Sequence, residues 1–175
     1  NIYLASGSSH HDLASLTAKS MGITLGDVER RMFPNTELYV RYGESVRGKH
    51  VFAIQSLAAV DGRSVNDSFM ELMIMVDAAK RASASEIAVV APYMAYGRQD
   101  RKAKGREPIS AATVIRGLQS AGADRIVSID MHSAQTQAPF NGPFDHLTAE
   151  PLLQAALKKR VKADPSQYVV VSPDG

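Results

Sequence analysis

The stretch "RIVSIDMH" (Arg125–His132) decides the fold class of this chain. It opens with a short β-rich run of the kind found in strands that are buried on both faces of a sheet. Similar runs lie at residues 2–6, 51–56, 87–92 and 168–172. Segments with helical spacing separate these runs and lie at residues 12–21, 67–82, 110–121 and 151–160. This alternation predicts an α/β fold with a parallel sheet and helices on both faces.

The predicted helices have plausible boundary residues. Ser110, and Thr148 or Glu150, are suitable helix starts, and Gly22 and Gly122 are suitable helix ends. Residues 29–50 break the strand and helix rhythm and predict a hairpin-like excursion, in which "LYVRY" alternates like a half-exposed strand.

The segment "GESVRGKH" (43–50) is similar to a Walker phosphate-binding loop. However, His50 replaces the hydroxyl residue of that motif, and a strand follows in place of the required helix. The segment is therefore predicted to be a turn between strands.

The composition limits the possible classes of protein. The chain has 175 residues, of which 45% are hydrophobic, and this is enough for a well-packed domain. A net charge of +2 with interspersed signs argues against a protein that coats a polyanion. Because there is no cysteine, disulfides and thiolate metal sites are excluded. Neither a signal peptide nor a membrane-spanning stretch is recognisable, so we expect a cytoplasmic protein without membrane contact.

Polar loops follow the predicted strands. Four such loops are "SGSSHHD", "APYMAYGRQDRKAKGR", "DMHSAQTQ" and "SPDG". Parallel sheets bind ligands at the carboxyl ends of their strands, and three of the four loops bring acidic, histidine or arginine side chains to that edge. They predict a site for phosphate and metal, although loops are polar in many proteins.

The second of these loops is strongly basic. Its cationic residues are Arg98, Arg101, Lys102, Lys104 and Arg106. Arginine side chains match phosphate oxygens, so the loop suits a polyphosphate. A solvated loop and a weak nucleic-acid patch are the alternatives, and the loop lacks the stacking aromatics of a known nucleic-acid module.

The sequence "DMH" offers two donors for a metal. In an extended chain Asp130 and His132 would lie on the same side, and Mg²⁺ needs few protein ligands because it keeps water and takes phosphate oxygens. Asp174 could complete the site. A histidine that is only hydrogen-bonded within its loop is the alternative.

The hairpin region offers a third candidate. On an extended strand, Phe33, Asn35 and Glu37 would point to one side and present an aromatic ring and two polar groups. That set suits a purine base, and it equally describes an ordinary exposed turn.

Taken together, these segments resemble the ribose-phosphate diphosphokinase (phosphoribosyl-pyrophosphate synthetase) family. The resemblance runs through nearly the whole chain, and its blocks stand in the family's order. The blocks are "SGSSHHDLA", "FPNTELYVRYGESVRGKHVFAIQS", "NDSFMELMIMVDAAKRASAS", "YGRQDRK", "PISA", "AGADRIVSIDMHSAQTQAPF" and "LTAEPLL". The family fold is phosphoribosyltransferase-like.

The resemblance implies an activity and roles for residues. The family transfers the diphosphoryl group of ATP to ribose 5-phosphate with Mg²⁺, which yields phosphoribosyl pyrophosphate and AMP. The resemblance implies adenine contacts that are shared between subunits of a homo-oligomer, a nucleotide pocket, and a metal site in which His132 serves catalysis. The implied residues are Phe33, Asn35 and Glu37 for adenine; Arg98, Gln99, Asp100, Arg101 and Lys102 for the pocket; and Asp130, His132 and Asp174 for the metal. In some members an allosteric phosphate site lies near the positions of Ser45 and Arg47.

The chain also departs from the family pattern. The Leu57–Val65 loop is longer than usual, and Gly97 stands where alanine is common. By the resemblance, residues 1–148 form the N-terminal domain and residues 149–175 begin a second similar domain, so we expect this piece to be inactive alone. A non-catalytic regulatory relative of the enzyme is the alternative function, and the intact Arg98, Gln99 and His132 favour the enzyme. We expect no nucleic-acid partner.

Overall fold

A five-stranded parallel sheet forms the centre of the protein. The computed structural model describes residues 1–161, 168–169 and 171–172. The strand order is β1-β4-β5-β6-β7, and each neighbouring pair is parallel. The strands are β1 (Ile2–Ser6), β4 (His50–Ile54), β5 (Glu86–Ala91), β6 (Arg125–Ile129) and β7 (Phe144–Leu147). The predicted parallel sheet is confirmed.

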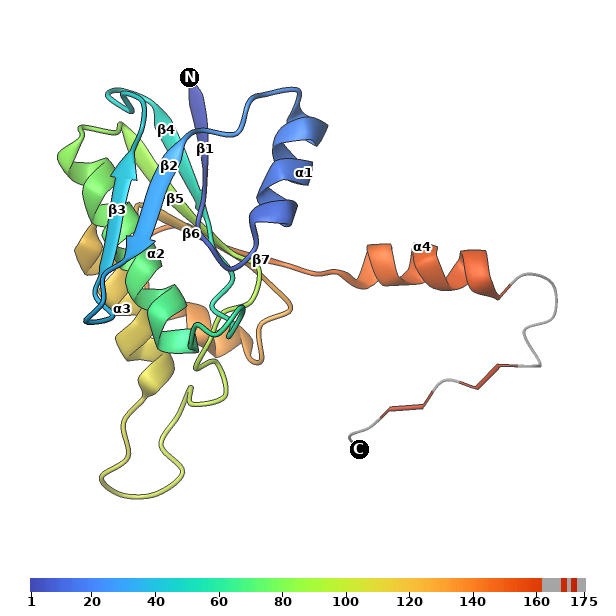
Figure 1. Ribbon diagram of the computed structural model, residues 1–175. Coiled ribbons are helices and arrows are strands. Elements are labelled where there is room, and N and C mark those ends of the chain that lie inside the picture. The colour runs from blue at the N-terminus through green and yellow to red at the C-terminus, as the bar shows by residue number, and fades with distance from the viewer. Residues whose placement is uncertain (162–167, 170, 173–175) are drawn as a thin grey trace.

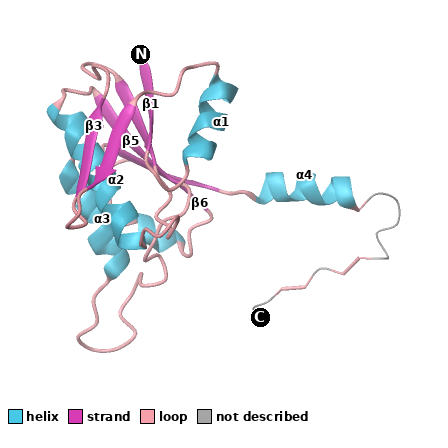
Figure 2. Cartoon of the chain, in the orientation of Figure 1, coloured by secondary structure: helices cyan, strands magenta, loops and turns pink. Residues whose placement is uncertain are grey.

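Helices cover both faces of this sheet, as predicted. The helix α1 (His11–Met21) lies on one face, and α2 (Val65–Arg81) and α3 (Ser110–Ala121) lie on the other (Figures 1 and 2). On the first face, the buried Ala14 and Ala18 of α1 pack with Leu4 and Ile54. The small alanine side chains bring the helix close to the sheet.

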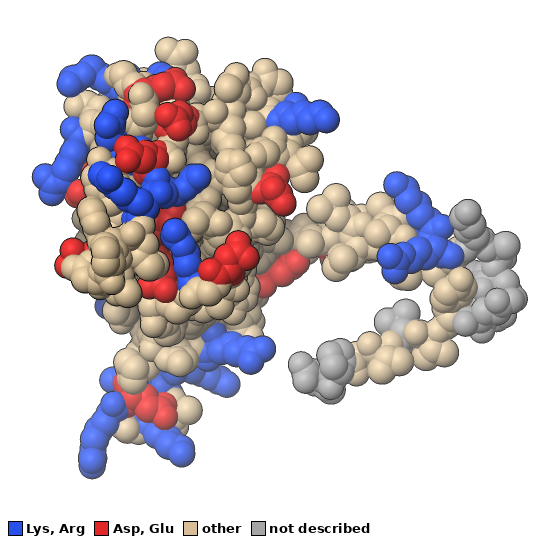
Figure 3. Space-filling model, viewed as in Figure 1, with Lys and Arg blue, Asp and Glu red and all other residues tan. Residues whose placement is uncertain are grey.

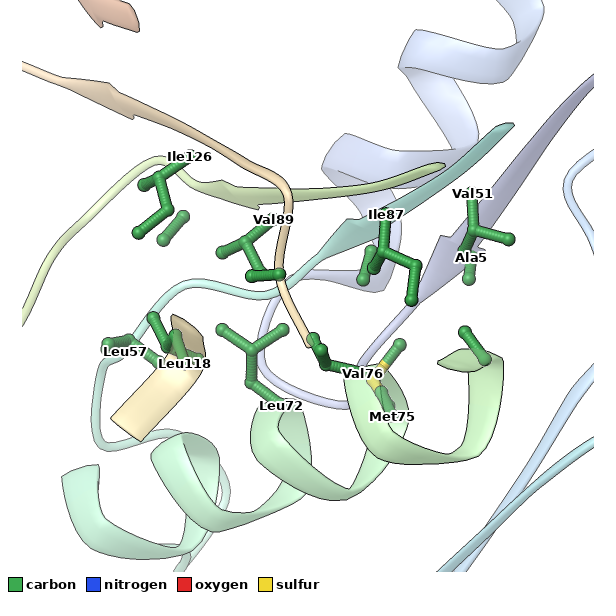
Figure 4. Packing of buried hydrophobic residues seen from close by; sticks show 14 of the residues in the cluster. Ala5, Val51, Leu57, Leu72, Met75, Val76, Ile87, Val89, Leu118 and Ile126 are labelled. Carbon is green, nitrogen blue, oxygen red and sulfur yellow. The ribbon is translucent and has the colours of Figure 1, made fainter. Parts of the chain in front are cut away.

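The larger core lies between the sheet and α2 (Figure 4). Alternate strand residues point to this side, because side chains along a strand change face at each step. Leu72, Met75 and Val76 of α2 are fully buried against them, together with Ile87 and Val89 of β5. Burial of these apolar side chains is the main driving force for the α/β arrangement.

The helix ends follow the signals in the sequence. Gly22 and Gly122 cap α1 and α3 in the left-handed conformation, with φ of 66° and 118°. The helix α2 begins with a reciprocal capping box, in which Ser64 and Asp67 each accept a hydrogen bond from the other's backbone N–H.

The predicted excursion is a two-stranded antiparallel hairpin, β2 (Val28–Met32) and β3 (Leu38–Tyr42). It packs on α2, where the Tyr42 hydroxyl donates a hydrogen bond to the Met75 carbonyl at 3.0 Å. Residues 43–49 then form the link to β4. The prediction that "GESVRGKH" is a turn between strands is therefore confirmed.

Two strand predictions need correction. The short strand β7 was not predicted, because "FDHL" carries two polar residues in four. The segment 168–172 was predicted as a strand, but its described residues Tyr168, Val169, Val171 and Ser172 have no regular secondary structure.

The helix α4 (Glu150–Arg160) lies where a helix was predicted, and it extends away from the sheet (Figure 1). None of its residues is buried, and Leu152, Leu153 and Leu157 are exposed. In the described part of the chain, no helix combines the length and the apolar character needed to cross a membrane.

Candidate functional site

The main candidate site is a cavity of about 430 Å³ at the carboxyl ends of β5 and β6. Neighbouring parallel strands bring the loops that follow them to the same edge of the sheet. The loop after β5 contributes Tyr93, Met94, Tyr96, Gly97, Arg98 and Gln99, and the end of β6 with its loop contributes Ile129, Asp130, Met131 and His132. Four of the predicted site residues therefore meet here: Arg98, Gln99, Asp130 and His132.

Hydrogen bonds hold the arginine side of the cavity against the start of α3. The backbone N–H of Gln99 donates to the Tyr96 carbonyl at 2.9 Å, and Ala111 N–H donates to the Gln99 carbonyl at 3.2 Å. The Ser110 hydroxyl also donates to Gln99 Oε1. These bonds fix the backbone on both sides of Arg98, whose side chain is exposed and able to meet a ligand.

The acidic side of the cavity has a different backbone from the one predicted. Asp130 has a left-handed φ of 44°, so Asp130 and His132 do not lie on an extended chain. The Asp130 N–H donates to the Leu147 carbonyl at 2.9 Å, and its carboxylate accepts from Ala149 N–H at 3.3 and 3.2 Å. Asp130 adopts this turn as the chain leaves the sheet, and its carboxylate caps the start of the segment that leads to α4.

The two sides of the cavity lie close together. A Cβ atom added at Gly97 would lie 3.6 Å from the Cβ of His132. The backbone next to His132 is also held, because Met131 N–H donates to His146 Nε2 at 3.0 Å. The turn that carries Arg98 thus packs against the loop that carries His132.

The remaining residues of the basic loop do not line this cavity. Arg101 and Lys102 are exposed, Asp100 is partly exposed, and the loop projects from the body of the protein with its cationic side chains outward (Figure 3). Glu107 Oε2 accepts hydrogen bonds from the N–H groups of Ala103 and Lys104, both at 2.8 Å, and closes the tip of the loop.

The hairpin residues lie away from the cavity lining, in the turn between β2 and β3. Phe33 N–H donates to the Glu37 carbonyl at 2.8 Å, and Asn35 Oδ1 accepts from Glu37 N–H at 3.2 Å. The prediction that Phe33, Asn35 and Glu37 alternate along an extended strand is therefore wrong, because Thr36 takes a left-handed φ of 71° and closes a tight turn. All three side chains are exposed.

Aromatic packing gives this turn a defined shape. The ring of Phe33 packs edge-on against Tyr39, with centroids 6.2 Å apart. The Arg31 guanidinium lies over the Tyr39 ring at 4.3 Å from its centroid and 5.6 Å from that of Phe33. The turn therefore presents a supported aromatic face to solvent.

Ser45 and Arg47 lie in a separate cavity of about 410 Å³. The link from β3 to β4 forms one wall of it, and Ala78 and Ala82 at the end of α2 form another. Arg41 and Glu44 also line this cavity. The structure thus places Ser45 and Arg47 together on a concave surface.

The donors for a metal ion are few. Among the described residues, no group of three or more histidine, cysteine, aspartate or glutamate side chains could hold a metal. Asp130 and His132 are two such donors at one cavity, and Asp174 lies outside the described residues. Two protein donors are compatible only with an ion that takes its remaining ligands from water or from a substrate, as Mg²⁺ does.

Sequence reasoning did not identify the tyrosines as cavity residues. Tyr93 and Tyr96 line the cavity and belong to the loop "APYMAYGRQDRKAKGR". Both tyrosines come shortly after the buried strand β5, outside its run of apolar residues, so burial within the strand does not account for them. Their position after the strand could have identified them as residues of the site.

Comparisons with known proteins agree with this arrangement. A sequence profile described as the N-terminal domain of ribose phosphate pyrophosphokinase matches residues 2–122. The chain is 47% identical to ribose-phosphate pyrophosphokinase 1 of Lactococcus lactis and 46% identical to ribose-phosphate pyrophosphokinase of Bifidobacterium longum, in each case over 99% of this chain. It spans about half the length of these relatives, 52% and 50%.

A solved structure has the same fold. The crystal structure of phosphoribosylpyrophosphate synthetase from Mycobacterium smegmatis matches with a TM-score of 0.82 and 41% sequence identity, over 92% of this chain and 53% of the other. The profile match covers most of the chain, and the cavity lies where the strands of such a sheet end. This chain therefore belongs to the family of ribose phosphate pyrophosphokinase N-terminal domains.

Proposed function

We propose that this chain is the nucleotide-binding part of a longer ribose-phosphate diphosphokinase. The reaction transfers the diphosphoryl group of ATP to the 1-hydroxyl of ribose 5-phosphate and yields phosphoribosyl pyrophosphate and AMP. The observation that carries the proposal is the single cavity that joins Arg98 and Gln99 to Asp130 and His132, in a chain of this family.

The cavity residues have distinct roles in this proposal. Arg98 binds phosphate oxygens through its planar guanidinium, and Gln99, held by Ser110 and Ala111, shapes the nucleotide pocket. His132 contacts the metal-nucleotide complex and acts in catalysis. Asp100, Arg101 and Lys102 approach the phosphates from the projecting loop and add charge at the rim of the site.

Asp130 and His132 fit Mg²⁺ bound through phosphate oxygens and water. The carboxylate of Asp130 has acceptor capacity beyond its bond from Ala149, and His132, two residues further along the chain, lines the same cavity. When bound, Mg²⁺ would neutralise charge on the transferred phosphates. The contribution of this chain to the reaction is orientation and charge complementarity, because phosphoryl transfer requires little covalent chemistry from the protein.

The hairpin turn extends the proposal to a homo-oligomer. Phe33, Asn35 and Glu37 are exposed and away from the cavity lining, and a turn with this aromatic face is suited to contact the adenine bound by a neighbouring subunit. Ser45 and Arg47 supply polar and cationic groups to a second cavity that would take a regulatory phosphate.

The test measures AMP production. The full-length protein should form AMP from Mg-ATP only when ribose 5-phosphate is present, and His132→Ala should reduce the rate at least a hundredfold, as is typical for a catalytic histidine. The control His11→Ala changes an exposed histidine at the start of α1 and should leave the rate unchanged.

Three other outcomes would change the assignment. A folded full-length protein that binds ATP but makes no AMP would indicate the regulatory relative. Affinity for nucleic acid that collapses with added salt and ignores ATP would indicate a nucleic-acid module. If the 175-residue chain alone made AMP, our proposal that it lacks part of the active site would be wrong.

A further inference from the structure

We infer that Tyr96 is a positioning residue and that its hydrogen bond to Asn66 holds the nucleotide-binding turn in its ligand-facing conformation. The Tyr96 hydroxyl donates to Asn66 Oδ1 at 2.5 Å. This bond joins the loop after β5 to the first turn of α2, two segments 30 residues apart in the chain. The inference rests on the proposed function of the cavity.

The backbone of Tyr96 is strained. Tyr96 has a φ of 62°, in the left-handed region that bulky residues rarely occupy. Such a conformation persists only when its surroundings hold it, and here its ring packs against the main core. The hydroxyl then adds a directional contact at the end of that ring, which the apolar packing alone does not supply.

This conformation sets the direction of the chain toward Arg98. The Tyr96 carbonyl accepts the hydrogen bond from Gln99 N–H at 2.9 Å, so Tyr96 opens the turn that contains Gly97 and Arg98. The same turn packs against His132 through Gly97. A change at Tyr96 therefore moves the phosphate-binding arginine relative to the metal-binding side of the cavity.

Asn66 is itself held in place. It lies in the first turn of α2, between the two members of the capping box, Ser64 and Asp67. The capped start of the helix holds the backbone that carries the acceptor, while the loop that carries the tyrosine has no regular secondary structure. Asn66 is therefore the fixed end of the contact and Tyr96 the positioned end.

Tyr96 also separates two cavities. Together with Tyr93 it lines the nucleotide cavity on one side and, on the other, a mostly apolar cavity of about 440 Å³ that is formed with Ala59, Ser64 and Val65. The longer Leu57–Val65 loop thus forms the surface behind Tyr96. The loop therefore meets the nucleotide site through Tyr96 and also through Tyr93, whose carbonyl accepts a hydrogen bond from Leu57 N–H at 2.9 Å.

The test uses the ¹⁵N-labelled chain with Tyr96→Phe, Asn66→Ala and the double variant. Amide hydrogen exchange at Gln99 should become several-fold faster in each, because the turn loses its restraint. Mg-ATP affinity, measured by titration of amide shifts, should fall roughly threefold to tenfold, the size expected from loss of one hydrogen bond. The double variant should be no worse than the singles, since all three remove the same contact.

Tyr3→Phe is the matched control, because it also removes a tyrosine hydrogen bond, at 2.8 Å to the Asp27 carbonyl, away from the cavity lining. It should change neither Gln99 exchange nor Mg-ATP affinity. Unchanged Gln99 exchange in Tyr96→Phe, or additive losses in the double variant, would overturn the inference. Faster exchange with unaltered affinity would also overturn it.

The failure of the proposed function would look different. If the wild-type chain did not bind Mg-ATP, the nucleotide assignment of the cavity would be wrong. Exchange at Gln99 would then decide by itself whether Tyr96 and Asn66 hold the turn.

Discussion

The Arg63 guanidinium Nη1 lies 2.5 Å from Oε2 of Glu71, a carboxylate that is almost completely buried in α2. The same carboxylate accepts hydrogen bonds from the N–H of Ser8 at 2.9 Å and from its hydroxyl at 2.5 Å. One buried charge therefore ties α2 to the Leu57–Val65 loop and to the loop after β1. It stabilises two of the loops at the carboxyl edge of the sheet.

Arg63→Met should destabilise the protein by about 3 kcal/mol, because it leaves the buried Glu71 carboxylate without its cation. Urea unfolding measures the change in the free energy of unfolding. Arg81→Met is the control, since Arg81 lies on α2 and pairs with Asp77 at an exposed site, and the change should cost much less than Arg63→Met. Equal losses in the two variants would contradict a structural role for the buried pair.

Asp67→Asn should flatten the dependence of stability on acid. Hydrogen bonds from the backbone and side chain of Ser64 lower the pKa of Asp67 below its ordinary value of 3.8. As the pH falls, the carboxylate therefore takes up a proton in the unfolded chain before it does so in the folded protein. The stabilisation is fully present above the unfolded pKa of 3.8 and is lost as the pH falls through the lower folded pKa. The free energy of unfolding should fall more between pH 7 and pH 3 in the wild type than in the variant. An equal fall in the two proteins would refute the stabilising role of the Asp67 carboxylate.

Tyr3→Phe should have its clearest effect in alkali. Burial, and then the charges of Glu44 and Asp27, raise the pKa of Tyr3 from 10.0 to about 12. The neutral form is favoured in the folded state, so stability is retained below pH 10 and falls as the pH rises from about 10 to 12. The variant should lose about 1 kcal/mol at neutral pH with the hydrogen bond, but should show a smaller alkaline decline. If the variant loses as much stability in alkali as the wild type, other groups cause the alkaline decline, and Tyr42, whose pKa burial also raises, is the first candidate.

Gly97→Ala should be tolerated. The added Cβ would lie 3.5 Å from the Met94 carbonyl oxygen and 3.6 Å from the Cβ of His132, which are ordinary contacts. We expect a gain of about 0.5 kcal/mol, because alanine reduces the freedom of the unfolded chain. Gly7→Ala should instead lose stability, since its Cβ would overlap the buried side-chain amide of Gln55. Thermal unfolding compares the two, and a destabilised Gly97→Ala would show that the turn cannot accept the family's commoner residue.

Arg98→Lys should weaken Mg-ATP binding about tenfold, because an ammonium group replaces a planar guanidinium that can bind two phosphate oxygens at once. Arg116→Lys is the matched control on the exposed side of α3 and should leave the affinity unchanged. Calorimetric titration of both variants measures the difference. No loss in either variant would mean that positive charge alone, and not the guanidinium at the cavity, attracts the nucleotide.

The sequence alone determined the layered architecture. Runs such as Ile87–Pro92 and "RIVSI" are apolar enough to be buried, and the helical segments between them leave few alternatives to a parallel sheet. Gly22 and Gly122 ended their helices as predicted, because positive φ is a local property of the residue. Arg98, Gln99, Asp130 and His132 could likewise be assigned to one edge, since parallel strands share their carboxyl ends.

Tertiary structure decided what local patterns do not encode. The polar segment "FDHL" becomes β7 only because β6 offers it a free edge, while the more β-prone Tyr168 and Val169 have no regular secondary structure. The left-handed turns at Asp130 and Tyr96 depend on Leu147, Ala149 and Asn66, which are distant in the sequence. Such contacts offset local strain, and they exist only once the chain has folded.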